Sequence, residues 1–110
     1  MAIDHERRTH PRIQPERGIY VEYPDLRPRV RDISLTGAFI EDNRPLSRGR
    51  MLNMTFWLDE QTPVTARAMV RRAEEGVGMG VEFLSMSNED RNRLRQFVGI
   101  SAQVERLQSF

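Results

Sequence analysis

The sequence contains no cysteine and no lysine, and it has no long hydrophobic run. Without cysteine, disulfide bridges, thiolate nucleophiles and zinc–thiolate sites are excluded. No apolar run has the length of a membrane span, and the charged N-terminus does not resemble a signal peptide, so we expect a cytoplasmic protein without membrane insertion. The net charge of +1 is too small for a protein that coats nucleic acid through many phosphate contacts.

All 17 basic residues are therefore arginines. The planar guanidinium group binds phosphates and base edges at two points and stacks on rings, which the lysine ammonium group does not do. The chain length of 110 residues suits one domain with one core. With 38% hydrophobic and 30% charged residues, the chain is expected to fold and to have a well-solvated surface.

Residues 1–17 are rich in arginine and have Ile3 and Ile13 as their only large aliphatic residues. Nothing in this segment repeats with the period of a strand or a helix. We therefore expect a flexible basic N-terminal arm that lies outside the core. For an isolated sequence, the simpler interpretation is a disordered, solvated tail.

Six short strands are predicted from alternating apolar residues and from the turn residues between them. They cover residues 18–23, 27–34, 38–40, 51–58, 64–71 and 77–83. Glycine at positions 78 and 80, on the polar side of the last strand, indicates a bulge or a close approach by another backbone.

A helix is predicted after the strands. Ser87 is a suitable N-cap, and Leu94, Phe97 and Val98 form one apolar helical face. Gly99 is well placed as the residue that ends the helix.

The pattern predicts a fold dominated by β-structure, a six-stranded antiparallel split β-barrel with a C-terminal α-helix. The barrel and its closing helix would span residues 18–99, and residues 100–110 would form a C-terminal helical extension.

Two short stretches carry the chemistry. The first is Arg8-Thr9-His10-Pro11-Arg12, and the second is Asp32-Ile33-Ser34-Leu35-Thr36-Gly37. Together they offer arginine forks, a carboxylate, hydroxyls and a glycine. If they meet in space, they suit a flat, anionic, guanine-like ligand, because guanine O6 and N7 form a two-point acceptor for arginine.

With both motifs in this order and followed by this strand pattern, nearly the whole chain resembles the PilZ domain family, a bacterial receptor module for cyclic di-GMP. The resemblance implies that Arg8 and Arg12 grip guanine edges and phosphates. Arg7 is a further candidate ligand residue, because an arginine at this place in the family tends to accompany a stacked, intercalated ligand dimer. We therefore favour two ligands per domain.

The second motif would act through three residues. Asp32 would accept hydrogen bonds from guanine N1–H and N2–H₂, Ser34 would donate to a phosphate or a base atom, and Gly37 would supply a conformation or a gap that a Cβ would obstruct. The structural alternative is that Asp32 and Ser34 cap a turn through their own backbone and that Gly37 is a turn glycine.

The resemblance implies a single-domain cyclic di-GMP receptor that needs no cofactor and is not an enzyme. Ligand binding would order the arm and change a surface for an unidentified effector protein, in motility, exopolysaccharide or secretion machinery. The alternative is an adaptor of the same fold that does not bind the nucleotide. DNA or RNA binding is disfavoured, because Tyr20, Tyr23 and Trp57 are the only aromatic candidates for it.

The side chain of Trp57 lies on the polar side of its predicted strand. It fits an exposed surface position or a contact with a partner protein equally well.

No enzyme active site is indicated, because the sequence offers no nucleophile–base pair and no phosphate-binding glycine loop. No metal site is expected either, because His5 and His10 have no third ligand near them.

Overall fold

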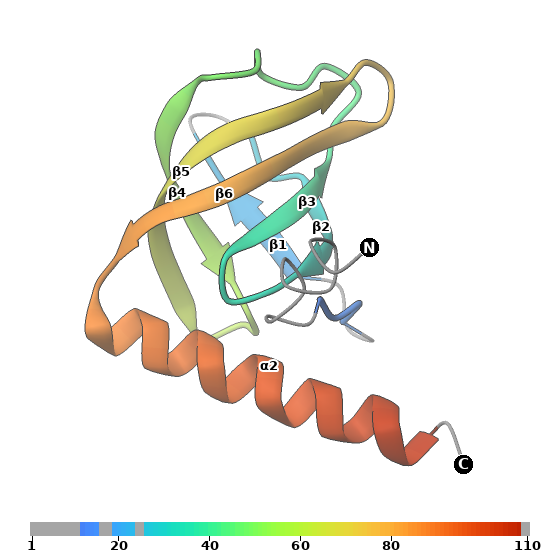
Figure 1. The fold of residues 1–110 in the computed structure, drawn as a ribbon, viewed down its shortest axis with the longest axis vertical. Coiled ribbons are helices and arrows are strands. Elements are labelled where there is room, and N and C mark those ends of the chain that lie inside the picture. The colour runs from blue at the N-terminus through green and yellow to red at the C-terminus, as the bar shows by residue number, and fades with distance from the viewer. Residues whose placement is uncertain (1–11, 16–18, 24–25, 109–110) are drawn as a thin grey trace, which may run out of the picture.

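The structure is a computed structural model, which describes residues 12–15, 19–23 and 26–108, with side chains described as far as residue 100. Within these residues, six strands precede one helix (Figure 1). The elements are β1 (Ile19–Glu22), β2 (Arg29–Ile33), β3 (Gly37–Glu41), β4 (Met51–Trp57), β5 (Pro63–Glu74), β6 (Gly78–Met86) and α2 (Asn88–Gln108).

The described strands form a closed antiparallel barrel in the order β1-β2-β3-β6-β5-β4. Closure is made by two pairings between strands that are distant in sequence, β1 with β4 and β3 with β6. The predicted fold class is therefore confirmed, and no described strand is left with an open edge.

The barrel interior is filled by the apolar residues of the alternating pattern. Along β5, for example, Val64, Ala66, Ala68 and Val70 are all at most 1% exposed, while the residues between them face outward. Alternation of this kind arises because successive side chains of a strand point to opposite faces of the sheet. The predicted interior positions are thus confirmed as core on β5, and on β4 for Met54 and Phe56, whereas Leu52 is half-buried and packs against the core.

Helix α2 lies across one end of the barrel and continues beyond it (Figure 1). Leu94 and Val98, which are 1% and 5% exposed, pack against the core. The Ser87 hydroxyl accepts a hydrogen bond from the Asp90 backbone N–H at 3.1 Å, so the predicted N-cap is confirmed.

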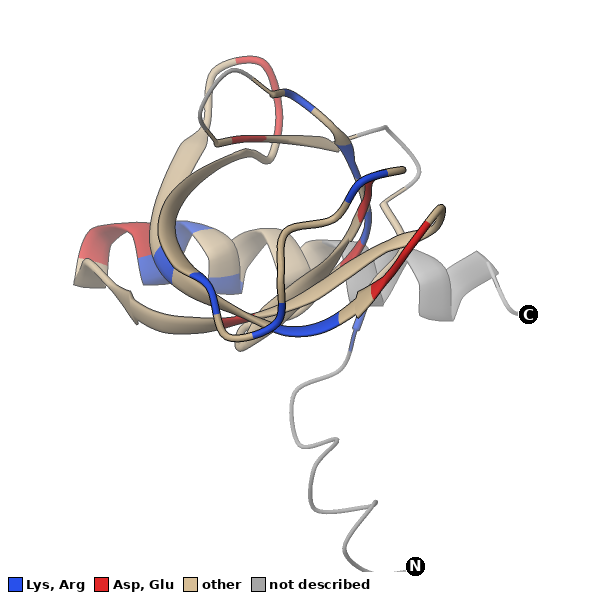
Figure 2. Cartoon of the chain, turned by 90° about the horizontal axis from the view of Figure 1, so that it is seen from above, with Lys and Arg blue, Asp and Glu red and all other residues tan. Residues whose placement is uncertain are grey.

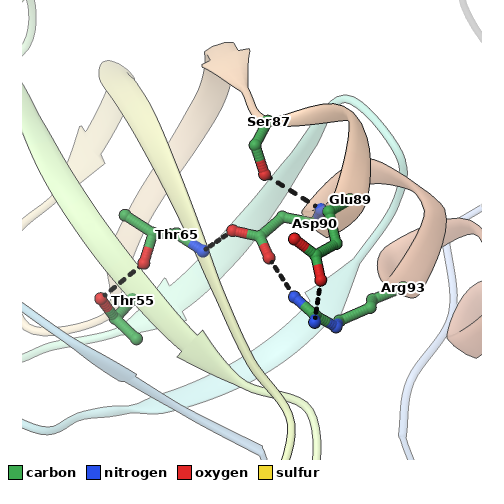
Figure 3. A network of polar contacts seen from close by, with 6 residues as sticks. All are labelled: Thr55, Thr65, Ser87, Glu89, Asp90 and Arg93. Atoms are coloured by element: carbon green, nitrogen blue, oxygen red, sulfur yellow. Dashed lines mark hydrogen bonds and ion pairs between the residues drawn. The ribbon is translucent and has the colours of Figure 1, made fainter.

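The start of α2 is also bonded to the barrel (Figure 3). The Asp90 carboxylate accepts a hydrogen bond from the Thr65 backbone N–H at 3.1 Å. It also accepts a hydrogen bond from the Arg93 guanidinium at 2.7 Å, with which it forms an ion pair. Thr65 lies one residue beyond the stretch of β5 that pairs with β6. The Asp90 carboxylate therefore satisfies a donor that the sheet leaves unpaired, and this contact holds the helix against β5.

The predicted helix end at Gly99 is wrong, because α2 continues to Gln108. A glycine inside a helix costs about 1 kcal/mol relative to alanine, which weakens a helix but does not stop one. Within the described residues, no helix combines the length and apolarity that a membrane span requires.

Candidate functional site

The site begins at a β-bulge in β2. Val30 pairs with Ile40 and Asp32 with Phe39, so the two residues Arg31 and Asp32 occupy the space of one step on β3. Val30 remains in the core, whereas Arg31 is exposed and Asp32 is half-buried. The bulge therefore presents a guanidinium and a carboxylate, adjacent in sequence, on the outer face of the barrel.

The segment that carries Arg12 is hydrogen-bonded to the C-terminal end of β2. Ile13 exchanges two backbone hydrogen bonds with Ile33, at 2.9 and 3.0 Å, and is 1% exposed within the core. The expectation that the whole arm lies outside the core is therefore wrong at Ile13. A buried isoleucine gains about 1.5–3 kcal/mol of transfer free energy, enough to anchor the residue beside it.

The two sequence motifs meet through Arg12 and Asp32. Arg12 Nη1 donates to Asp32 Oδ1 at 2.8 Å, and the two side chains are 56% and 17% exposed. An ion pair this exposed contributes about 0–1 kcal/mol, so a ligand can take over its bonds at little cost. Arginine has five N–H donors, and this bond uses one of them.

Beside Asp32 lies a ring covered by two guanidinium groups. Phe39, the cross-strand partner of Asp32, points away from the core and is nevertheless 3% exposed. The guanidinium carbons of Arg31 and Arg72 lie 4.4 and 5.7 Å from the centre of its ring. Gly80, opposite Phe39 on β6, leaves room for this packing.

A second bulge brings Arg72 to this position. The register of β5 and β6 shifts between Val70 and Arg72, and Arg72 pairs with Gly80. Asp32, Phe39, Gly80 and Arg72 therefore form one cross-strand row on the outer face. We call Arg31, Phe39 and Arg72 the arginine–phenylalanine platform.

Ser34 acts within its own turn. Its hydroxyl accepts a hydrogen bond from the Thr36 N–H at 3.1 Å and lies 3.4 Å from the Gly37 carbonyl, and the residue is 2% exposed. This is the turn-capping role given above as the structural alternative, and here it applies to Ser34. It does not apply to Asp32, whose carboxylate accepts a hydrogen bond from Arg12.

Gly37 is needed for a close approach between strands. A Cβ at this position would collide with the Val81 carbonyl oxygen of β6. Among the described glycines, positive φ angles occur at Gly49 and Gly76 and not at Gly37. The gap, rather than a special conformation, is therefore the reason for this glycine.

Arg7 and Arg8, which were predicted to bind the ligand, lie outside the described part of the chain. So do His5 and His10, at which no metal site was expected. Among the described residues, no group of three potential metal ligands occurs. Figure 2 shows basic and acidic positions interspersed along the described part of the barrel backbone.

The platform was not foreseen from the sequence. Ala38, Phe39 and Ile40 form one apolar run, in which nothing marks the middle residue as outward-facing. The available signal was Gly80, because a glycine in a strand interior indicates close packing by a neighbour. The anchoring role of Ile13 was equally open to detection, as a lone aliphatic residue directly after the motif.

The family model for the PilZ domain matches residues 6–99. No curated protein matches the chain.

Solved structures of the same fold include the inhibitor of motility MotI/DgrA of Bacillus subtilis, with 22% identity, a TM-score of 0.71, and coverage of 90% of this chain and 52% of that one. YcgR of Escherichia coli in complex with c-di-GMP has 19% identity, a TM-score of 0.74, and coverage of 94% and 49%. The PilZ domain of YcgR with c-di-GMP has 20% identity, a TM-score of 0.70, and coverage of 94% and 97%.

The chain thus spans about half the length of MotI and of the longer YcgR structure. At these identities the likeness to the solved structures concerns the fold, whereas the family match extends over most of the sequence. The motifs, the barrel and the family model agree, and the chain belongs to the PilZ domain family.

Proposed function

We propose that this chain is a receptor for cyclic di-GMP. The observation that carries the proposal is the contact between Arg12 and Asp32, because it brings the two family motifs together on the outer face of the barrel. A site for guanine needs an arginine fork and a carboxylate within reach of one base. This contact supplies both in one place.

Each described group has a chemical role in this proposal. Arg12 binds O6 and N7 of a guanine, and Asp32 accepts hydrogen bonds from its N1–H and N2–H₂ edge. The arginine–phenylalanine platform offers a flat cationic surface beside Asp32, on which a purine face can stack. The charge of Arg72 also favours the phosphates of a cyclic dinucleotide, whereas that of Arg31 is shared with Glu41 at 3.7 Å.

Arg7 and Arg8 complete the proposed site from the arm, by binding phosphates and a second guanine. With Arg7 present, we propose that the ligand binds as an intercalated dimer. Ser34 and Gly37 belong to the site as the residues that shape the turn after Asp32. Ser34 closes the turn, and Gly37 lets β3 approach β6 closely.

The proposed consequence of binding is a change in a surface that an effector protein recognises. Residues of the arm close over the ligand, with Ile13 as the fixed point from which they do so. The output then acts through protein–protein contact. The names of MotI, an inhibitor of motility, and of YcgR in complex with c-di-GMP support motility as the first process to test, before exopolysaccharide synthesis and secretion.

The test is calorimetric titration of the purified chain with cyclic di-GMP, with GTP and cyclic di-AMP as controls. Arg12→Ala and Asp32→Ala should each weaken binding about tenfold or more, because each removes a charge-assisted hydrogen bond. Asp32→Ala should also reduce the preference for cyclic di-GMP over cyclic di-AMP. Arg95→Ala, an exposed arginine on α2, is the matched control and should bind as the wild type does.

The double variant extends this test. Because Arg12 and Asp32 touch, their effects should be non-additive, whereas Arg95→Ala should add independently to either. A stoichiometry of two ligands per chain supports the intercalated dimer. If cyclic di-GMP gives neither heat nor a shift in melting temperature, the receptor proposal fails and the non-binding adaptor takes its place.

A further inference from the structure

The two halves of helix α2 have different surroundings. The first half packs on the barrel through Leu94 and Val98, and the second half continues beyond the barrel (Figure 1). In the second half, the positions that would continue this barrel-facing stripe at helical spacing carry Ser101 and Glu105. The apolar pattern that serves the barrel therefore ends at Val98, although the helix runs to Gln108.

A second apolar stripe begins where the first one ends. Phe97, Ile100, Val104 and Leu107 follow one another at spacings of three, four and three residues. With 3.6 residues per turn, positions 100, 104 and 107 fall within an arc of about 60°, centred about 130° away from the barrel-facing stripe. Ile100 is 58% exposed, and Phe97, which also packs against the core, is half-buried. We call these four residues the second stripe.

The part of α2 that carries most of the second stripe is too short to be stable on its own. Isolated helices of fewer than about 12–15 residues are marginal in water, and helices in proteins are stabilised mainly by packing of an apolar face. Beyond Gly99, which is itself a poor helix former, α2 has nine residues. Packing of the second stripe against a partner would stabilise this part of the helix.

The residues beside the second stripe discriminate among partners. The four flanking positions are uncharged, namely Gln96, Ser101, Gln103 and Gln108. The charged residues of this part, Glu105 and Arg106, fall about 130° from the centre of the stripe, one on each side. Helices that lie on membranes are rich in basic residues around their apolar face, and charges at the flanking positions direct a helix to a different partner helix. Uncharged flanks favour neither, but they let two identical copies approach without bringing like charges together.

The spacing of the second stripe is also complementary to itself. Three, four and three residues read the same in both directions along the helix. In an antiparallel pair, Ile100 would therefore lie opposite Val104 of the second copy, and Phe97 opposite its Leu107. An antiparallel pair also places the two barrels at opposite ends, because each barrel covers the first half of its own helix (Figure 1).

We propose that α2 is a self-association helix, through which two copies of this chain pack their second stripes together in antiparallel orientation. The interface is smaller than a standard protein–protein interface, so we expect a dissociation constant of about 10–100 µM. The contact between Arg12 and Asp32 lies on the barrel, and each copy keeps its own. The inference therefore does not depend on the binding of cyclic di-GMP.

Sedimentation equilibrium of the full chain tests the proposal. Between about 5 and 500 µM the chain should pass from monomer to dimer, and its melting temperature should rise with concentration. Ile100→Arg and Leu107→Arg should each raise the dissociation constant at least tenfold, because each places an unpaired charge in the interface. Arginine is a good helix former, so both variants keep the helix.

Two controls separate association from folding. Ala102→Arg adds the same charge on the opposite side of the same part of the helix, and it should associate as the wild type does. Ile100→Arg should leave the melting temperature of the dilute chain unchanged, because Ile100 is exposed in the single chain.

The absence of cysteine permits a test of the orientation. A tagged Ile100→Cys chain, mixed with an untagged Val104→Cys chain under mild oxidation, should form the mixed disulfide faster than either variant forms a disulfide with itself. The difference in size between the tagged and untagged chains distinguishes the three products on a gel.

Three results would overturn the inference. One is a wild-type chain that stays monomeric throughout the concentration series, and another is an equal loss of association in Ala102→Arg and Ile100→Arg. The third is a predominance of the two self-linked products over the mixed disulfide, which the antiparallel arrangement does not allow.

Discussion

At the scale of single residues, the two glycines Gly37 and Gly99 have opposite relations to their surroundings. A Cβ on Gly37 would collide with the Val81 carbonyl, because β3 and β6 run too close together at that point. Apart from its chain neighbours and the surrounding backbone of α2, no described atom lies within 4 Å of the Cβ position of Gly99, which lies inside α2. The same substitution therefore has opposite expected effects at the two positions.

We predict that Gly37→Ala lowers the free energy of unfolding by about 1–3 kcal/mol, since the added methyl group forces the strands apart. Gly99→Ala should raise it by about 0.5–1 kcal/mol, because alanine is the better helix former in an open position. Urea unfolding of both variants beside the wild type measures the difference. If Gly37→Ala left the free energy of unfolding unchanged, β3 and β6 would not be in such close contact.

Sequence reasoning at this scale identified positions better than it identified roles. The spacing of Asp32, Ser34 and Gly37 marked the right turn, but a motif does not reveal which side chain is satisfied internally. Ser34 and Gly37 are occupied with the turn and the neighbouring strand, whereas Asp32 points to Arg12. That difference arises from packing against β6 and from the bulge in β2, which have no local sequence signature.

At the scale of elements, the segment around Ile13 connects the arm to the barrel. It combines a buried side chain with two backbone hydrogen bonds to Ile33, next to a residue of the proposed site. We therefore expect stability and the proposed ligand binding to be coupled at this point.

We predict that Ile13→Ala lowers the free energy of unfolding by about 2–4 kcal/mol through the cavity it leaves. It should also weaken cyclic di-GMP binding at temperatures where the variant remains folded, because Arg12 loses its anchor. Arg12→Ala is the contrasting variant, and it should lose binding with little change in stability. If Ile13→Ala unfolds as the wild type does, the segment is not part of the core.

The strands were predictable because their interior residues alternate, and the start of α2 was predictable because Ser87 and the acidic residues after it form a recognisable cap. The end of α2 was not, since a glycine is compatible with both a helix end and a helix interior. The irregularity between β5 and β6 lies opposite Gly80, where the glycines of the last strand had indicated a bulge or a close approach. The bulge in β2 was missed, because it depends on the register between neighbouring strands, which a single sequence does not contain.

At the scale of the whole molecule, a buried tyrosine makes stability depend on alkaline pH. The Tyr23 hydroxyl donates to Asp42 Oδ2 at 2.7 Å and ties the end of β1 to the residue that follows β3. Burial, and then the hydrogen bond to this carboxylate, raise the pKa of Tyr23 well above its ordinary value of 10.0. The folded barrel therefore holds this proton more tightly than the unfolded chain does.

A raised pKa means that the stabilisation is fully present below the unfolded value of 10.0 and is lost as the pH rises above it. We predict that the free energy of unfolding falls as the pH is raised from neutral to about 11. Few other groups titrate in this range, because the chain lacks lysine and cysteine.

Urea unfolding across this pH range measures the effect. Tyr23→Phe should be less stable than the wild type at neutral pH by about 1 kcal/mol and should show a flatter alkaline dependence. Tyr20→Phe is the control, because Tyr20 is exposed, and it should retain the wild-type dependence. Equal alkaline dependence in both variants would contradict the assignment to Tyr23.

Barrel closure through β1–β4 and β3–β6 also sets the order of events during synthesis. When β1 leaves the ribosome its second partner, β4, has not been made, and β3 must wait for β6, which ends at Met86. Folds rich in such non-local pairings fold in about milliseconds to seconds, and their unpaired edges are open to aggregation until closure. The nascent chain should therefore depend on chaperone protection until almost all of its strands have emerged.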